Sequence, residues 1–285
     1  MTTTIQTGND DRSQNTQTLP ATAQRMVCLD VDGTIVNHDG LMSDPVRQAA
    51  TDVVKAGHRV VIATGRSLGA ALPVAQALGI TEGHIVCANG GVTARLDPSL
   101  EAGYEVTVRR TFDPGPALRA VRDVLPTAKY AVETTEGSFL STERFQDASF
   151  GAPAQGVPFE ELLVAQAVRL VVFSTDSTAE EFGRAVESIG LHGVTYSVGW
   201  TAWLDIAARG VTKASGLEVL RAHLGVEREA TVAVGDGRND IEMLGWAHRG
   251  VAMGQAPDEV KIAADEITGG VDEDGLAPVL RSLLG

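Results

Sequence analysis

The chain has 285 residues, of which 44% are hydrophobic and 21% are charged, a composition typical of a soluble globular protein. Lys and Arg total 23 against 37 Asp and Glu, so the formal net charge is −14. This excess of acid argues against nucleic-acid binding, which needs a basic surface, and no apolar stretch approaches the roughly 20 residues of a membrane helix.

The N-terminal segment and the two cysteines indicate where the protein works. Residues 1–24 are rich in Thr, Gln, Asn and Asp and lack the apolar centre of a signal peptide, which predicts a disordered tail. Cys28 and Cys87 lie in apolar runs without the CxxC spacing of zinc or redox sites. We therefore expect two buried thiols and a cytoplasmic location.

Short apolar runs alternate with amphipathic segments from Arg25 onward. In chain order we predict a strand over 26–29, a helix from Ser43 to Lys55, a strand over 59–63, a helix over 67–78 and a strand over 84–87. Strands and helices that alternate at this spacing form a parallel sheet with right-handed crossovers.

The pattern changes at the turn Asn89-Gly90-Gly91. The predicted elements that follow are a hairpin of 91–95 with 104–110, helices over 116–125 and 178–189, and strands over 129–133, 138–140, 168–174 and 194–198. Closely spaced strands of this kind indicate an antiparallel sheet. We therefore predict a separate α+β domain over residues 92–201.

Strand–helix alternation returns at Trp203-Leu204-Asp205-Ile206. The remaining predicted elements are strands over 203–206, 231–234, 251–253 and 266–268 and helices over 212–224, 239–244 and 276–284. The simplest account is a doubly wound, Rossmann-like α/β core made of residues 25–91 and 202–285, with the α+β domain inserted between these two segments.

Polar residues follow three of the predicted core strands. The first strand runs into Asp30 and Asp32, the second into Thr64-Gly65-Arg66, and the strand over 231–234 into the segment GDGRND at 235–240. Because the carboxyl ends of parallel strands share one edge of the sheet, these segments are expected to meet there.

The residue types at this edge point to phosphoryl transfer. Crowded carboxylates without His or Cys favour a hard cation, and Asp30, Asp236 and the backbone carbonyl of Asp32 suit Mg²⁺. The Asp30 carboxylate can also act as a covalent nucleophile, with Asp32 as general acid and base. Lys213, Thr64 and nearby amides would bind the phosphate.

The complete predicted site has overlapping groups. We predict the catalytic residues Asp30, Asp32, Thr64 and Lys213, the substrate-binding residues Thr64, Gly65, Arg66, Lys213 and Asn239, and the metal-binding residues Asp30, Asp32, Asp236 and Asp240, the last directly or through water.

Each motif also has a structural interpretation. A DxD segment occurs in solvated turns, a helix lysine usually faces solvent, and the Gly-Asp-Gly segment suits a calcium-binding or structural turn. The DxD, Thr-Gly-Arg and Gly-Asp-Gly segments occur in this order, each at a predicted strand end, and together they favour one shared site. Glu133, Glu136 and Arg144 in the insertion are as consistent with solvent as with substrate, and Trp200 and Trp203 are interpreted as packing residues.

The motifs together resemble the haloacid dehalogenase (HAD) superfamily, specifically Cof-type phosphatases with a type IIB cap. DVDGT at 30–34, TGR at 64–66, GVTK at 210–213 and GDGRND at 235–240 are similar to the four family motifs. Two further stretches look like this subfamily, ANGG at 88–91 and VAMGQA at 251–256. The insertion lies where the family carries its cap. Ala214 and Ala88 depart from the residues usual at those positions.

The resemblance implies a Mg²⁺-dependent phosphoric monoester hydrolase acting on a small phosphorylated metabolite, often a sugar phosphate or a phosphorylated cofactor. No nucleic-acid or membrane partner is expected, and the sequence carries no indication of the oligomeric state. Two alternatives are a phosphomutase of the same superfamily, which would isomerise a sugar phosphate, and a binding module that keeps the fold without turnover. The presence of both Asp30 and Lys213 favours catalysis.

Overall fold

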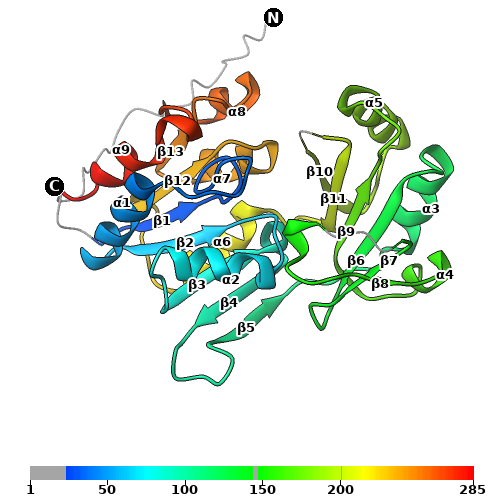
Figure 1. Ribbon diagram of the computed structural model, residues 1–285, viewed down its shortest axis with the longest axis horizontal. Helices are drawn as coiled ribbons and strands as arrows, with labels where there is room; N and C mark the ends of the chain where they lie inside the picture. Colours follow the sequence, from blue (N-terminus) through cyan, green and yellow to red (C-terminus); the bar gives the residue numbers. More distant parts are fainter. Residues whose placement is uncertain (1–23, 144–146, 200) are drawn as a thin grey trace, which may run out of the picture.

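A computed structural model describes residues 24–143, 147–199 and 201–285. The predicted tail, apart from Gln24, lies outside the described residues, as do Arg144 and Trp200. The described part has two bodies, a core built on an eight-stranded sheet and a cap built on a six-stranded sheet (Figure 1). No helix in the described ranges is both long enough and apolar enough to cross a membrane.

The core sheet has the order β14-β13-β12-β1-β2-β3-β4-β5. Its strands are β1 (Met26–Leu29), β2 (Arg59–Ala63), β3 (Gly83–Cys87), β4 (Val92–Leu96), β5 (Tyr104–Arg109), β12 (Thr231–Gly235), β13 (Arg249–Ala252) and β14 (Glu266–Ile267). β1 is fully buried and pairs in parallel with both β2 and β12, so segments about 200 residues apart in sequence become neighbours. The predicted doubly wound α/β core is confirmed.

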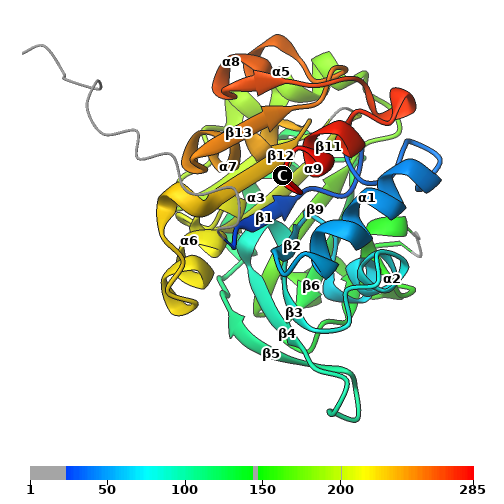
Figure 2. The ribbon, with the colours of Figure 1, turned by 90° about the vertical axis from the view of Figure 1, so that its left-hand side faces the viewer.

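Helices cover both faces of this sheet (Figure 2). They are α1 (Asp44–Lys55), α2 (Leu68–Ala77) and α9 (Leu276–Arg281) on one face, and α6 (Lys213–His223), α7 (Ile241–Trp246) and α8 (Asp258–Ala263) on the other. Alternate residues of β1 enter the two layers, since Val27 and Leu29 pack in the first core cluster and Cys28 in the second. The sheet therefore forms a rigid base for residues at its edge.

The cap sheet has the order β10-β11-β9-β6-β7-β8. Its elements are α3 (Gly115–Val124), β6 (Lys129–Thr134), β7 (Phe139–Ser141), β8 (Gln155–Gly156), α4 (Phe159–Leu162), β9 (Ala167–Phe173), α5 (Ala179–Ile189), β10 (Val194–Val198) and β11 (Trp203–Ala208). Its helices lie on the side of the cap sheet away from the core (Figure 1). The inserted α+β cap is confirmed.

Sheet membership corrects the domain boundaries expected at 91/92 and 201/202. The predicted hairpin forms, but β4 pairs antiparallel with β3 and extends the core sheet instead of opening the cap. β11, expected in the core, pairs antiparallel with β9 and β10 in the cap sheet. A strand's own side-chain pattern does not specify its neighbour, and the tight turn at 89–91 returns β4 alongside β3. The links between core and cap therefore lie near residues 110–111 and 209–212.

Candidate active site

The predicted site residues meet at the carboxyl edge of the core sheet. Asp30 directly follows β1, Thr64 follows β2 and Asp236 follows β12, three neighbouring parallel strands. Lys213 is the first residue of α6, which is capped by Thr212, whose hydroxyl accepts a hydrogen bond from the Ser215 amide at 3.2 Å. Close approach of α6 to the sheet depends on Gly90, where an added Cβ would lie 2.1 Å from the Thr212 carbonyl oxygen.

A buried lysine joins two of the carboxylates. Lys213 Nζ donates to Asp30 Oδ1 at 2.6 Å and to Asp240 Oδ1 at 2.7 Å, and its side chain is fully buried. Asp240 Oδ2 accepts from the backbone amides of Asp236 and Gly237 at 3.0 and 2.9 Å. Both oxygens of Asp240 are thus engaged by the protein, so this carboxylate holds Lys213 and the 235–240 loop in place.

We call Asp30, Asp236, Asp240 and Lys213 the core cluster. Ligand atoms of its three carboxylates lie within 4.8 Å of one another, and all three residues are buried. Burial and repulsion from Asp240 raise the pKa of Asp30, against the opposing effect of Lys213. The same two causes raise the pKa of Asp236 to about 6. Burial alone would lower the pKa of Lys213, but Asp240 and Asp30 raise it.

The donor set of the core cluster fits Mg²⁺. Three carboxylates and one ammonium leave two negative charges uncompensated, and all the clustered donors are oxygens, as a hard divalent cation prefers. Space beside Asp236 is kept by Gly33, at φ +76°, where a Cβ would lie 2.2 Å from Asp236 Oδ2. Asp236 is held by Gln255 Nε2 at 3.3 Å and Thr34 Oγ1 at 3.4 Å.

Asp32 and Arg66 form a bidentate pair outside the core cluster. Arg66 Nε donates to Asp32 Oδ2 at 2.9 Å and Nη2 donates to Oδ1 at 2.6 Å, and the Asp32 side chain is 61% exposed. Both residues line a cavity of about 480 Å³ that also contains Asp30 and Asp236. The exposed carboxylate is thus positioned where a group entering this cavity would meet it.

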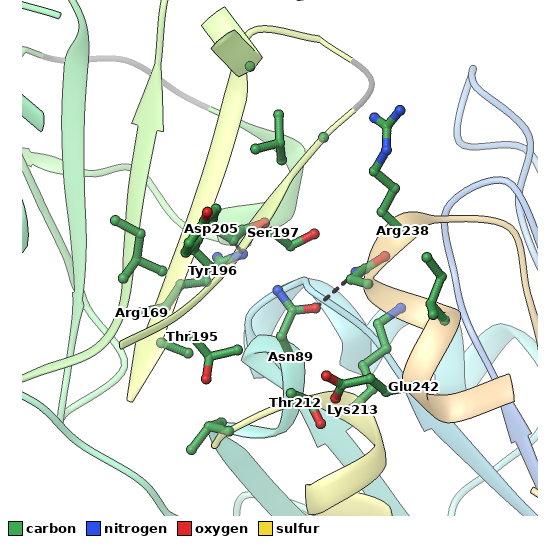
Figure 3. Close-up of a pocket in the computed structure, with 18 of the residues that line it drawn as sticks. Asn89, Arg169, Thr195, Tyr196, Ser197, Asp205, Thr212, Lys213, Arg238 and Glu242 are labelled. Atoms are coloured by element: carbon green, nitrogen blue, oxygen red, sulfur yellow. Dashed lines mark hydrogen bonds and ion pairs between the residues drawn. The ribbon is translucent and has the colours of Figure 1, made fainter. Parts of the chain in front are cut away.

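The remaining predicted residues also lie at this edge. Thr64 is fully buried, and its hydroxyl accepts from the Arg66 amide at 3.1 Å, which leaves the hydroxyl hydrogen free to donate. The Gly65 carbonyl accepts a hydrogen bond from Arg169 of the cap. Asn239 Nδ2 donates to Asn89 Oδ1 at 2.9 Å, a contact drawn in Figure 3.

Asn89 and Gln255 are two of the polar residues here that were absent from the predicted site set. Asn89 adopts a left-handed conformation with φ 51° and holds Asn239, while Gln255 Nε2 also donates to the Gly33 carbonyl at 2.6 Å. Both lie in stretches already noted for their resemblance, ANGG at 88–91 and VAMGQA at 251–256. The signal was therefore present, although neither residue is acidic or basic.

The cap presents charged side chains to the core through strand alternation. Leu170, Val172, Leu204 and Ile206 pack under the cap helices, so their neighbours on β9 and β11 point the opposite way. This places Arg169 and Asp205 on the core-facing side. Figure 3 shows both on the cap strands, opposite Asn89 and Lys213 of the core.

We call Glu133, Arg169 and Asp205 the cap cluster. Arg169 Nε donates to Glu133 Oε2 at 3.2 Å, and its Nη1 lies 3.5 Å from Asp205 Oδ1. We expected Glu133 to be as consistent with solvent as with substrate. This expectation is corrected, because Glu133 is only 2% exposed and its carboxylate is buried beside the equally buried Arg169. Glu136 is exposed. Burial raises the pKa of both Glu133 and Asp205, with Arg169 opposing the increase.

The cap cluster lies above the site and borders two cavities. Arg169 and Asp205 line both the cavity of about 480 Å³ that contains Asp30 and a larger one of about 860 Å³ that reaches α5, β10 and Lys213. The cap also docks on the core at Ser67, whose amide donates to the Ser149 carbonyl at 2.8 Å and whose hydroxyl donates to the Phe150 carbonyl at 2.7 Å. A ligand at Asp30 would therefore lie between the two bodies.

Comparison with known proteins assigns the family. Residues 27–280 match the model of the haloacid dehalogenase-like hydrolase family, so the chain belongs to this family and is an enzyme of the HAD type. It is 25% identical to the phosphatase YwpJ of Bacillus subtilis, over 91% of this chain and 100% of the relative. It is 27% identical to a phosphoglycolate phosphatase of Methanopyrus kandleri, over 91% and 97%.

A solved structure confirms the predicted subclass. The HAD subclass IIB sugar phosphatase BT4131 superposes with a TM-score of 0.75 and is 26% identical, covering 90% of this chain and 98% of the other. The predicted resemblance to Cof-type phosphatases with a type IIB cap is confirmed, as is the predicted enzyme class of phosphoric monoester hydrolases.

Proposed function

We propose that this protein is a Mg²⁺-dependent phosphatase that hydrolyses small phosphate monoesters, sugar phosphates or phosphorylated cofactors, through an aspartyl-phosphate on Asp30. The observation that supports it most strongly is the buried contact of Asp30 with Lys213 beside two further carboxylates. Relatives named as phosphatases, including a sugar phosphatase and a phosphoglycolate phosphatase, support the same reaction class.

In the first step an Asp30 oxygen attacks phosphorus, and the ester P–O bond breaks. Asp32, exposed in the same cavity, gives its proton to the departing alcohol oxygen. Lys213 orients Asp30 and opposes the rise in its pKa that burial causes. Together with Thr64, Gly65, Arg66 and Asn239, Lys213 is also a proposed phosphate contact. Phosphoryl transfer depends mainly on positioning and charge neutralisation, which these groups supply.

In the second step water attacks the phosphorus of the aspartyl-phosphate and gives a proton to Asp32. The Asp30 O–P bond breaks, inorganic phosphate leaves, and both carboxyl groups return to their starting states. Asp30, Asp236 and the Asp32 carbonyl are the proposed Mg²⁺ ligands, with Asp240 acting directly or through water. The bound ion would neutralise charge on the phosphate and bring it against Asp30. A cytoplasmic location and a small phosphorylated metabolite as partner, with no nucleic acid and no membrane, belong to the same proposal.

The proposal is tested by phosphate release from p-nitrophenyl phosphate with and without Mg²⁺. We expect turnover that is lost on chelation, and a fall of at least about 10³-fold in kcat for Asp30→Asn, because the nucleophile is removed. Asp39→Asn is the matched control, since Asp39 is an exposed carboxylate shortly after the same strand.

Two results would contradict the proposal. Full turnover by a folded Asp30→Asn variant would remove Asp30 as the nucleophile. Isomerisation of a sugar phosphate with little free phosphate, dependent on a bisphosphate activator, would instead identify a phosphomutase.

A further inference from the structure

Asp205 of the cap cluster has a buried oxygen without a hydrogen bond. Its Oδ2 accepts from Trp203 Nε1 at 3.1 Å, but Oδ1 is buried and has no hydrogen-bond partner among the described residues. The nearest cation is Arg169, whose Nη1 lies 3.5 Å away. A buried acceptor of this kind is costly unless something donates to it.

Arg169 is already engaged by other acceptors. Its Nε donates to Glu133, its Nη1 to the Gly65 carbonyl and its Nη2 to the Ser149 carbonyl at 3.4 Å. Two carboxylates therefore share one guanidinium, which leaves the cap cluster with one negative charge in excess. The Asp205 side chain is 17% exposed and lines both adjoining cavities, so a donor that enters them would meet this carboxylate.

The larger cavity is lined by five acidic and four basic residues, so its formal charge is −1. Among its lining residues Glu180 pairs with Arg184, and Glu259 with Arg238. Glu187 and Glu242 line the same cavity without an ion pair to any described residue. A second negative charge on the leaving group would be repelled here, whereas hydroxyl groups would find acceptors.

We propose that Asp205 is a specificity-determining residue that accepts a hydrogen bond from a hydroxyl of the leaving group. It selects phosphate monoesters of neutral, polyhydroxylated alcohols over alcohols that lack hydroxyl donors or carry a carboxylate. This inference rests on the proposed phosphatase function. A site with a buried polar group rejects an analogue that leaves the group unpaired, which gives stronger discrimination than apolar contact.

The geometry supports contact with the leaving group rather than with the phosphate. Asp205 lies on the cap strand β11, whereas the proposed phosphate contacts Thr64, Lys213 and Asn239 belong to the core. Asp205 lines the same cavity as Asp30, so a phosphate seated at Asp30 would extend its alcohol portion toward the cap.

The test compares kcat/KM for sorbitol 6-phosphate, hexyl phosphate and phosphoglycolate, with Mg²⁺ present. We expect the wild-type protein to prefer sorbitol 6-phosphate over hexyl phosphate by at least about 10²-fold, because only the polyol supplies donors. Asp205→Ala should reduce this ratio at least about tenfold. Asp205→Asn, which removes the charge and keeps the shape, should raise phosphoglycolate turnover relative to sorbitol 6-phosphate.

Asp123 supplies the matched control, because it is an exposed aspartate on α3 that lines neither cavity. Its Ala and Asn variants should keep the wild-type substrate ratios. If the ratio of kcat/KM for sorbitol 6-phosphate to kcat/KM for hexyl phosphate in Asp205→Ala stays within about threefold of the wild-type ratio, the role of Asp205 is overturned. The proposed phosphatase function would not be affected by that result. Absence of phosphate release from all three esters by the wild-type protein would overturn the proposed function instead. Substrate ratios are insensitive to partial loss of folded protein, so reduced stability of a variant does not obscure the outcome.

Discussion

The core cluster and the cap cluster both bury carboxylates around one cation, but they are built differently. In the core, the carboxylates follow the ends of parallel strands and meet a lysine at the first turn of a helix. In the cap, the charged groups stand in the middle of strands, on one face of the sheet, and meet by cross-strand packing. The core cluster has two uncompensated negative charges and the cap cluster one.

This difference separates the two roles that we propose. An excess of two charges among oxygen donors suits a divalent cation, whereas an excess of one charge beside a free carboxylate oxygen suits a neutral donor. The comparison is therefore open to tests that remove the cation of each cluster in turn.

Lys213→Met should destabilise the protein most. It leaves three buried carboxylates without their cation, and removing one partner of a buried pair costs about 3–5 kcal/mol. Urea denaturation without metal measures the free energy of unfolding. Lys55→Met at the exposed end of α1 should change it by no more than about 0.5 kcal/mol. Millimolar Mg²⁺ should stabilise the Lys213→Met protein more than the wild type. If Mg²⁺ raises the free energy of unfolding of Lys213→Met by no more than it raises that of the wild type, the proposed distinction between the two clusters is wrong.

Arg169→Met should lower the free energy of unfolding by about 3 kcal/mol near neutral pH. Mg²⁺ should stabilise this variant no more than it stabilises the wild-type protein. Burial raises the folded-state pKa of Glu133 and Asp205 above their ordinary values, and loss of Arg169 raises it further. A carboxyl group with a raised folded-state pKa destabilises the fold when ionised, so the loss should shrink as pH falls toward 5. Urea denaturation at both pH values measures this. Arg119→Met on the exposed face of α3 is the control. A loss that is constant with pH would mean that Arg169 acts through packing alone.

Gly33→Ala should lower the free energy of unfolding by about 1–3 kcal/mol and should also lower the affinity for Mg²⁺. Its left-handed φ of +76° strains any side chain, and the added Cβ would meet the Asp236 carboxylate at 2.2 Å. Gly40→Ala is closely matched, since φ is +75° there but nothing lies within 4 Å of the added Cβ. Thermal unfolding and Mg²⁺ dependence of turnover compare the two variants. Equal effects would show that backbone strain, and not space beside Asp236, explains the loss.

Much of the candidate active site was predictable from sequence because strand polarity is enough to bring strand ends together. Asp30, Thr64 and Asp236 each follow a short apolar run, and this pattern is local and visible. The bonds of Asp240 to Lys213 and to the 235–240 loop were not predictable, because they depend on a loop conformation that no periodicity encodes.

The cap cluster was largely missed because its members are single polar residues inside apolar strands. Arg169 interrupts the apolar run Ala167–Phe173. A lone arginine in such a run indicates that it has a buried partner, but the sequence does not identify which residue that partner is. Sheet membership was equally hidden. The β4–β5 hairpin was recognised, yet its side-chain pattern did not indicate that it extends the core sheet.

The insertion of the cap also determines when the site can assemble. Asp30 and Lys213 are 183 residues apart, and Thr34 and Asp236 are 202 residues apart, so these contacts join segments that precede and follow the inserted cap in sequence. Contacts of such long separation form slowly during folding. A nascent chain emerging from the ribosome carries Asp30, the proposed nucleophile, early but acquires Lys213 and the 235–240 loop only after the whole cap has been synthesised. The core cluster can therefore assemble only after the 235–240 loop has been synthesised.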